Sequence, residues 1–596
     1  MLIIILDHPD SLFALIIFIP SYPYILKPGI MKNLLLASLF VIAVVLNACT
    51  GNAGRQEKPN ILLIMADDLG YSDLGCYGSE ISTPNLDRLA ENGIRFTEFY
   101  NSARCCPSRA SVLTGLYPHQ AGIGSFVGPD RGEHGYSGRL TPNAVTLAEV
   151  LRGAGYRTFG AGKWHVNFPG PTDRGFEEFY GFLEDYGIDS WEPKWMQRYP
   201  EGHPERKYEA GEFFATNAIT DYAIDFLGLA AQTPGKPWFM YLAYQAPHFP
   251  LQAPEKDIRK YEDVYKTGWD SIRMQRYRRM KELGVIEPQV HLSERSKIPV
   301  PRLAERNGVP GDGLTNPAWD MLGRARKQDL ARRMAVFAGM VDNMDQNIGR
   351  VIEYLDKNDE LNNTLVIFLS DNGACAEWDP YGFEYPGFND RVAGGTPGHP
   401  SNTYSGDSVN MLGGPGGPLF SYGSGWANAG NTPFTLYKQY THEGGISTPL
   451  IIHWPGKIKK TGIFRDAYAH VNDIMATCVA VSGAEYPDVY KGNAISPMEG
   501  ISLFETIEGK ADPQRVLTFE HSGHPAIRVG KWKLVSDDKA MDKNGFPEDA
   551  VFELYNIAKD RSETNNLAYK YPGKVKQLKE LMMKEFERTH VLPRPF

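Results

Sequence analysis

The sequence predicts an α/β fold, in which a mostly parallel sheet flanked by helices precedes a smaller C-terminal subdomain with an antiparallel sheet and a helix. After residue 59, short apolar runs alternate with helical stretches, which is typical of βαβ units. From residue 487 the apolar runs follow one another without long helices between them. Of the 596 residues, 42% are hydrophobic and 22% are charged, so the chain can bury a core, and disordered, collagen-like and coiled-coil structures are excluded.

The N-terminal region predicts export. Lys32 precedes an uncharged run, 34–46, that is too short to span a membrane and has the order of a secretory signal. The run ends in Leu-Asn-Ala-Cys49, which resembles the lipobox of bacterial lipoproteins. We therefore expect an exported protein of the bacterial periplasm or cell envelope, lipid-anchored at Cys49. The segments are then 1–30 as a mis-called upstream extension, 31–48 as the signal peptide and 50–58 as a tether. The alternative is a plain cleaved signal with an incidental cysteine.

Five short apolar runs are predicted to be strands, and each is followed by side chains that can do chemistry. The strands span 60–65, 94–100, 157–161, 238–243 and 364–369; the side chains after them are, in the same order, Asp67 and Asp68, Cys105, Lys163 and His165, His248, and Asp371 and Asn372. Ligands of an open α/β sheet bind beyond the carboxyl ends of its strands. We therefore expect these five clusters to meet at one edge of a catalytic domain, 59–486.

The other elements are predicted to be scaffold. Helices are expected over 83–92, capped by Thr83, and over 330–355, where apolar residues recur at helical spacing. Residues 374–435 are rich in Gly, Pro and aromatics without periodicity, which predicts an ordered but irregular wall.

The C-terminal subdomain, 487–596, should pack as a separate small sheet. Strands are expected over 516–520, 527–535 and 551–556. The helix from Pro572 carries Val575, Leu578, Met582 and Phe586 on one stripe, so we expect that stripe to pack on the body.

Six cysteines are few for a long exported chain, so no dense disulfide framework is expected. Cys105 and Cys106 are adjacent, and a bridge between neighbours would be strained, because their Cα atoms lie about 3.8 Å apart against a usual 5.5–6 Å. We therefore expect Cys105 and Cys106 to have a role other than forming a disulfide with each other. Pro107 and Gly115 suit the start and the end of a short helix, which puts Cys105 at a helix N-terminus, where anions are favoured. Arg109, one turn on, adds a positive charge.

The string Cys105-Cys-Pro-Ser-Arg109-Ala-Ser-Val-Leu-Thr-Gly115 resembles the signature of the type I, formylglycine-dependent sulfatases. The chain resembles this family from about residue 59 to residue 567, and within the family it resembles a bacterial arylsulfatase-type branch. It implies an alkaline-phosphatase-like fold and oxidation of Cys105 to an aldehyde, 3-oxoalanine (formylglycine), whose hydrate attacks sulfur. It also implies a transient partner, a formylglycine-generating or sulfatase-maturating enzyme.

A cation site is expected at the two acidic or amide pairs. A single Asp after a strand is more often a turn or cap residue, but two such pairs are less easily incidental. Because Asp67, Asp68, Asp371 and Asn372 offer only oxygens, they suit Ca²⁺, with the modified Cys105 and substrate completing the coordination. The resemblance implies the same four residues and calcium.

The resemblance also assigns roles to side chains that could otherwise be surface or loop residues. Lys163 would hold a sulfate oxygen, His165 would assist the aldehyde hydrate, and His248 and Lys438 would act on the leaving oxygen. The predicted catalytic set is therefore Cys105, Arg109, Lys163, His165, His248 and Lys438.

The sequence thus predicts an enzyme that hydrolyses sulfate monoesters, on carbohydrates or aryl sulfates. Alternatives are a phosphonate or phosphate ester hydrolase of the same superfamily, and an inactive glycan-binding lipoprotein. No basic patch argues for nucleic acid, and the formal charge is -9. Candidate substrate-contacting side chains are Trp191, Trp378, Trp426, His203, Arg391, Glu520, His521 and His524.

Overall fold

The computed structural model of the chain describes residues 2–6, 13–17, 58–183, 187–301, 305, 308–377, 380–385, 402–508, 515–536 and 540–596. It divides into two compact units, Met1–Glu57 and Lys58–Phe596. In the first unit, β1 (Leu2–Leu6) and β2 (Phe13–Ile17) pair antiparallel. The predicted signal peptide, the lipidation site Cys49 and residues 50–57 of the tether lie outside the described residues and stay predictions.

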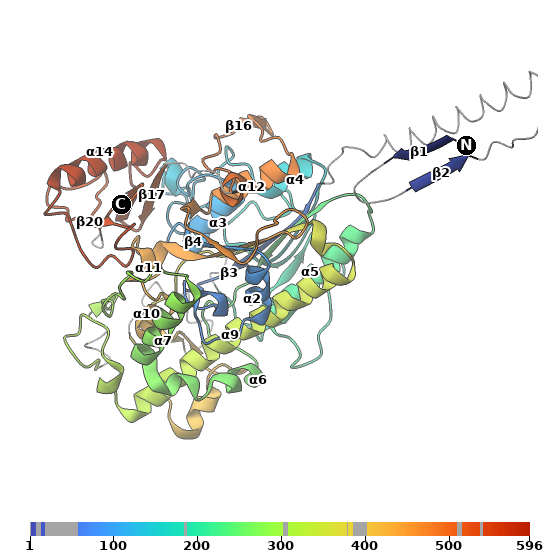
Figure 1. Cartoon of the computed structure of the whole chain (residues 1–596). Coiled ribbons are helices and arrows are strands. Elements are labelled where there is room, and N and C mark those ends of the chain that lie inside the picture. Colours follow the sequence, from blue (N-terminus) through green and yellow to red (C-terminus); the bar gives the residue numbers. More distant parts are fainter. Residues whose placement is uncertain are drawn as a thin grey trace, which may run out of the picture. The chain divides into compact units, whose positions relative to one another are not determined.

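The second unit is built on a large mixed sheet (Figure 1). The five predicted strands are all present, as β3 (Asn60–Ala66), β4 (Ile94–Tyr100), β5 (Arg157–Lys163), β8 (Trp238–Ala243) and β9 (Thr364–Ser370). Within the described residues, ten strands form this sheet, in the order β13-β4-β12-β9-β3-β8-β5-β6-β7, with β14 beside β4. The prediction of a mostly parallel α/β sheet is confirmed.

One strand runs against the others in the middle of the sheet. β12 (Ser447–His453) lies between β4 and β9 and pairs antiparallel with both. Because β12 is antiparallel to both of its neighbours, β4 and β9 run in the same direction. All five predicted strands therefore run the same way. Their carboxyl ends meet at one edge of the sheet, as expected.

Helices cover both faces of this sheet (Figure 1). Alternate side chains of β3 divide between the two cores: Leu62 and Ile64 point toward one set of helices, and Ile61 and Leu63 toward the other. The first core includes α2 (Pro84–Glu91), α5 (Ala215–Ala231), α7 (Gly268–Leu283) and α9 (Arg324–Lys357); the second includes α3 (Cys105–Thr114), α4 (Leu147–Gly153) and α12 (Asp473–Ser482). A sheet buried on both faces explains why its strands are continuous apolar runs.

The predicted helices are present with adjusted ends. α9 extends beyond the predicted 330–355 at both ends. Thr83 stands at the N-cap of α2 but makes no side-chain capping bond. Its hydroxyl instead donates to Asp87 Oδ1, at 3.0 Å, and accepts from the backbone of Gly75, at 2.9 Å. The predicted capping hydrogen bond of Thr83 is therefore wrong, although α2 begins where the sequence predicted it.

The C-terminal subdomain is a four-stranded antiparallel sheet of β17 (Val516–His521), β18 (His524–Val529), β19 (Trp532–Val535) and β20 (Glu553–Asn556). The single strand predicted over 527–535 is wrong, because the chain turns at Gly530 and forms two paired strands. α14 (Pro572–Arg588) packs on this sheet through Leu578, Met582 and Phe586, as its stripe predicted.

The boundary proposed at residue 487 falls between α12 and the next hairpin. Ile495, Leu503 and Ile507, beyond that boundary, are buried in the second core of the large sheet. A third apolar cluster, including Tyr100, Ile446, Leu517 and Phe519, joins the large sheet to the small one.

Short elements fill the connections. Among the described residues, the remaining strands are β6 (Glu178–Phe182), β7 (Gln197–Tyr199), β10 (Glu384–Tyr385), β11 (Leu419–Phe420), β13 (Ile463–Arg465), β14 (Ala469–His470), β15 (Val489–Tyr490) and β16 (Asn493–Ala494), and the remaining α-helices are α6 (Glu255–Ile258), α10 (Gly423–Gly430), α11 (Glu443–Ile446) and α13 (Phe504–Ile507). No helix in the described ranges is both long and apolar enough to cross a bilayer. All five cysteines from Cys76 to Cys478 are free thiols, so in this part of the chain packing holds the fold together.

Gly162, next to the last residue of β5, has a φ of +111°, and a Cβ there would lie 1.8 Å from the carbonyl oxygen of Ala243. We expect Gly162→Ala to lower the free energy of unfolding by about 2 kcal/mol or more, since the sheet must move to accept the methyl group. Gly153→Ala is the matched control, because nothing lies within 4 Å of a Cβ at that position. Urea unfolding of both variants checks this, and equal midpoints would contradict it.

Candidate active site

The register of two neighbouring strands brings the acidic and amide pairs together. β3 and β9 pair in parallel with Ala66 opposite Ser370, so the residues that follow them leave the sheet side by side. The backbone N–H of Asp68 donates to Asp371 Oδ1, at 3.3 Å, and Asn372 Nδ2 donates to Asp68 Oδ1, at 2.7 Å. The four predicted metal-binding side chains thus form one cluster, and all are buried.

Two cations hold the first half of this cluster. Arg109, from α3, contacts Asp371 Oδ2 at 2.8 Å and Asp67 Oδ2 at 3.4 Å through Nη2. Lys163, at the end of β5, lies 2.5 Å from the same oxygen of Asp67. The side chains of all four residues are wholly buried. Buried charges of one sign are tolerated only with partners of the other sign, so this cluster requires its cations.

Asp68 faces a second pair of basic groups. Lys438 Nζ lies 2.7 Å from Asp68 Oδ1, and His248 Nε2 lies 3.4 Å from Asp68 Oδ2. His248 Nδ1 donates to the carbonyl oxygen of Phe249, at 2.5 Å, which fixes the orientation of the ring. Lys438 comes from a loop far along the chain, and its backbone N–H bonds to Ala374, just beyond β9.

Cys105 is the first residue of α3 and lies beside His165 and Cys106. One ligand atom of each of these three buried side chains lies within 4.8 Å of the others. Although burial opposes it, the hydrogen bond with Cys106 and the positive charge of Lys163 hold the pKa of the Cys105 thiol well below its usual range. The site therefore favours a negative charge at this position, as the helix N-terminus also does.

The two histidines are neutral at neutral pH. Burial lowers the pKa of His165 to about 4. Burial also lowers the pKa of His248 well below its usual value, and the nearby charge of Lys438 adds to this effect. Neutral imidazoles at these positions can accept a proton.

The donor set fits a divalent cation. Asp67 Oδ1 and Asn372 Oδ1 are buried and have no hydrogen-bond partner. Burial raises the pKa of Asp68 to about 6 and that of Asp371 well above its usual value, with the neighbouring Asp67 adding to both. A cation would offset this mutual repulsion and satisfy the two free oxygens, and carboxylate and amide oxygens suit a hard ion.

The structure adds polar residues that the sequence did not single out. Arg104, immediately before Cys105, pairs with Glu377 at 3.3 Å, and Gln439 Nε2 donates to the same Glu377 oxygen at 2.7 Å. The only sequence signal is that Arg104 and Gln439 each adjoin a predicted catalytic residue. The pairing itself depends on the tertiary fold.

Two of the candidate substrate-contacting residues are corrected. Trp426 is fully buried, packs among Trp269 and Trp319, and donates to Leu330 O at 2.8 Å, so it belongs to the core. Glu520 is buried and pairs with His119 at 2.9 Å. Both were interpreted as substrate walls because a sequence does not reveal which aromatic or charged side chains are enclosed.

The other candidates differ in exposure. The His203 side chain is 44% exposed, and its Nδ1 lies 2.9 Å from Glu178 Oε1. Trp191 is half-buried against Phe214, and His524 contacts the ring of Tyr440. His521 is buried, and burial together with Arg104 lowers its pKa to about 3. Trp378 and Arg391 lie outside the described residues.

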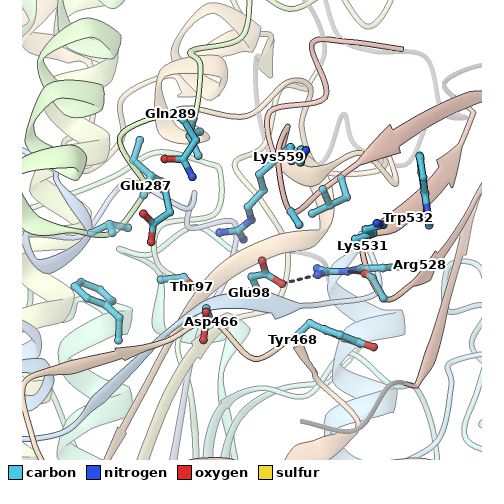
Figure 2. A pocket seen from close by; sticks show the side chains of 18 of the residues that line it. Thr97, Glu98, Glu287, Gln289, Asp466, Tyr468, Arg528, Lys531, Trp532 and Lys559 are labelled. Atoms are coloured by element: carbon cyan, nitrogen blue, oxygen red, sulfur yellow. Dashed lines mark hydrogen bonds and ion pairs between the residues drawn. The ribbon is translucent and has the colours of Figure 1, made fainter. Parts of the chain in front are cut away.

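A separate cavity of about 820 Å³ lies between the large sheet and the C-terminal sheet (Figure 2). An ion pair of 2.6 Å between Glu98 and Arg528 crosses its wall, and Trp532 and Tyr468 also line it. None of the predicted site residues lines it. Its walls carry side chains of both charges, among them Lys531, Lys559 and Arg561 and the acidic Glu287 and Asp466.

Known proteins resemble this chain both in sequence and in fold. A family model described as Sulfatase matches residues 59–484. An arylsulfatase of Klebsiella aerogenes is 34% identical over 465 residues, covering 76% of this chain and 92% of that protein. An N-acetylgalactosamine-6-O-sulfatase of Bacteroides thetaiotaomicron is 26% identical over 565 residues, covering 89% and 94%. The crystal structure of Ps i-CgsB with k-i-k-neocarrahexaose has a TM-score of 0.58 at 24% identity, covering 90% and 94%.

The pairing of Glu520 makes a prediction about acid stability. His119 and Arg594 outweigh the effect of burial and lower the pKa of Glu520 from about 4.5 to about 2. A carboxyl group with a lowered pKa stabilises the folded state above its unfolded pKa, and this stabilisation is lost as the pH falls from about 4.5 toward 2. We expect Glu520→Gln to cost about 3 kcal/mol at pH 7 and progressively less below pH 4.5.

Urea unfolding of the wild type and the variant between pH 7 and pH 3 measures this difference. Glu580→Gln, at an exposed position of α14, is the control and should change stability little at any pH. A difference for Glu520→Gln that stays constant over this range would contradict the assignment.

Proposed function

The chain belongs to the sulfatase family and is a sulfatase, and on this premise we propose that it hydrolyses sulfate monoesters of carbohydrates with a formylglycine hydrate, formed from Cys105, beside a bound calcium ion. The observation that supports this most directly is the convergence of three buried carboxylates, one amide oxygen and three basic side chains around Cys105. Hydrolysis consumes one water, breaks the bond between sulfur and the ester oxygen, and releases sulfate and an alcohol.

When present, the calcium ion supplies positive charge to the sulfate oxygens, and the aldehyde hydrate supplies the attacking hydroxyl. Asp67, Asp68, Asp371 and Asn372 would hold the ion. Arg109 keeps Asp67 and Asp371 in place, because its Nη2 contacts both carboxylates. Lys163, from the same cluster, adds a fixed charge for a sulfate oxygen.

Proton transfer falls to the histidines. His165 is neutral and lies beside Cys105, so it can take a proton from a hydroxyl at that position. His248 and Lys438 both face Asp68 from the other side of the cluster. Burial opposes it, but Asp68 holds the pKa of Lys438 well above its usual value, so this ammonium stays charged and can stabilise a departing alkoxide.

A carbohydrate substrate is supported by the relative named N-acetylgalactosamine-6-O-sulfatase. Aryl sulfates are the alternative class, in line with the relative named arylsulfatase. A phosphate monoester carries nearly two negative charges where a sulfate monoester carries one, whereas a phosphonate monoester also carries one. Turnover of sulfate, phosphate and phosphonate esters of the same alcohol therefore separates the activities.

Cys105→Ala should reduce hydrolysis of a chromogenic aryl sulfate by about 10³-fold or more, because it removes the group that becomes the nucleophile. Cys478→Ala, which removes a buried thiol in α12, should retain turnover and serves as the control. Mass spectrometry of the peptide containing Cys105, after expression with a maturation enzyme, should show an aldehyde. Full activity of Cys105→Ala, or an active enzyme with only unmodified thiol, would refute the proposed nucleophile.

Calcium should stabilise the folded protein. A ligand that binds only the folded state adds about 2.7 kcal/mol at a concentration 100 times its Kd, so we expect the melting temperature to rise with added Ca²⁺. Asp67→Asn should reduce this rise, because it removes one ligand charge. Asp549→Asn, at an exposed position, should not change it.

Differential scanning fluorimetry of chelator-treated protein with graded Ca²⁺ makes this measurement without substrate. The same rise in the wild type and in Asp67→Asn would show that the ion binds elsewhere.

A further inference from the structure

A second group of metal-binding atoms adjoins the oxygen cluster, and the proposed reaction uses it only in part. The thiols of Cys105 and Cys106 and the imidazole of His165 are buried, with one donor atom of each within 4.8 Å of the others. Neither ring nitrogen of His165 makes a hydrogen bond of good geometry. The ring is enclosed and faces the Cys105 thiol, which is the polar group that acts on it most strongly.

The chemistry of these donors differs from that of their neighbours. Two sulfurs and one imidazole nitrogen form the donor set of thiophilic ions such as Zn²⁺, whereas carboxylate and amide oxygens select Ca²⁺ or Mg²⁺. We infer that the folded chain, before Cys105 is converted, binds one Zn²⁺ through Cys105, Cys106 and His165. A water molecule can complete a tetrahedral site of three protein ligands.

The geometry requires a small adjustment. Zinc binds sulfur at about 2.3 Å and imidazole nitrogen at about 2.0–2.1 Å, so donors around one ion lie roughly 3.5–4 Å apart. Because the three atoms lie within 4.8 Å of one another, they need to approach by at most about 1 Å, which side-chain rotation can supply. Each thiol that ligates the ion gives its proton to solvent, and no electron is transferred.

The charges around the site allow a second cation. The fixed positive groups that act on the thiols are all paired with carboxylates. Arg109 and Lys163 pair with Asp67 and Asp371, Lys438 pairs with Asp68, and Arg104 pairs with Glu377. Two thiolates would balance the charge of Zn²⁺ itself. The neighbouring sulfur of Cys106 hydrogen-bonds to the backbone oxygen of Ser125, at 3.7 Å, a weak contact that a metal bond can replace.

Conversion of Cys105 removes one sulfur from this set. The converted chain retains only Cys106 and His165, so the zinc site belongs to the unconverted form alone. Zinc would therefore occupy the thiol that has to be oxidised. This inference depends on Cys105 being a thiol in the form tested, and it does not depend on the sulfatase activity of the converted form.

The test uses the full chain expressed without a maturation enzyme, with the Cys105 thiol verified by mass spectrometry. Isothermal titration with Zn²⁺, in excess Ca²⁺ to occupy the oxygen cluster, should show one site. Cys106→Ala and Cys106→Ser should each weaken Zn²⁺ binding by at least about 100-fold, since each removes a ligand. Cys478→Ala, which removes a buried thiol elsewhere, should bind Zn²⁺ as the wild type does.

Co²⁺ reports the ligands directly. The unconverted wild type should show the absorption of cobalt bound to thiolate in a tetrahedral site, and the Cys106→Ser variant should lose most of it. Circular dichroism and melting curves establish that each variant is folded. Zn²⁺ binding of equal affinity in Cys106→Ser, or in the fully converted chain, would overturn the inference, and absent sulfatase activity in the converted chain would instead count against the proposed function.

Discussion

The site depends on one constraint, which is that three carboxylates are enclosed together at the end of two paired strands. The parallel register of β3 and β9, with Ala66 opposite Ser370, leaves Asp67, Asp68 and Asp371 no room to separate. Removing such charges from water costs several kcal/mol each unless partners of opposite charge are fixed nearby. The wholly buried Arg109 and Lys163, and Lys438 beside Asp68, follow from this requirement.

The scaffold supplies those partners from elements far apart in the sequence. Arg109 comes from α3 on one face of the sheet, Lys163 from the end of β5, and Lys438 from the loop before α11. The antiparallel β12 closes the gap between β4 and β9, so Cys105, which follows β4, reaches the same edge as Asp371. Packing on both faces of the sheet thus fixes the distances between charges that the chemistry needs.

The sequence predicted the positions of strands and helices better than it predicted which residues lie next to one another in the fold. All five strands before the site, α3 and the stripe of α14 follow from apolar periodicity and turn residues, which are local signals. The strand β12 was not predicted, and no local pattern would have shown that it runs against its neighbours. The break at Gly530 was missed, because one glycine does not distinguish a turn from a strand residue. Trp426 and Glu520 were misplaced as substrate walls, since enclosure is a property of the tertiary structure. The family signature in residues 105–115 predicted Cys105 and Arg109 as site residues, whereas no pattern in the chain indicates the pairing of Arg104 with Glu377.

The backbone at the site supports the view that its geometry is fixed before any ligand binds. Asp68 and His165 have φ values of +66° and +51°, and Ala103, two residues before Cys105, has +61°. Side chains other than glycine adopt this region at a cost on the order of 1 kcal/mol or more each. The surroundings offset that cost: Asp68 N bonds to Asp371, and Ala103 N bonds to Asn101 Oδ1 at 2.7 Å. Strained residues thus occur at both donor sets, with Asp68 among the oxygen donors and Ala103 and His165 at the thiols. The oxygen donors are therefore held in place by hydrogen bonds and ion pairs before a cation binds, whereas the donors of the proposed zinc site would still rotate toward one another. The chemical identity of residue 105 would decide whether a second sulfur belongs to that site.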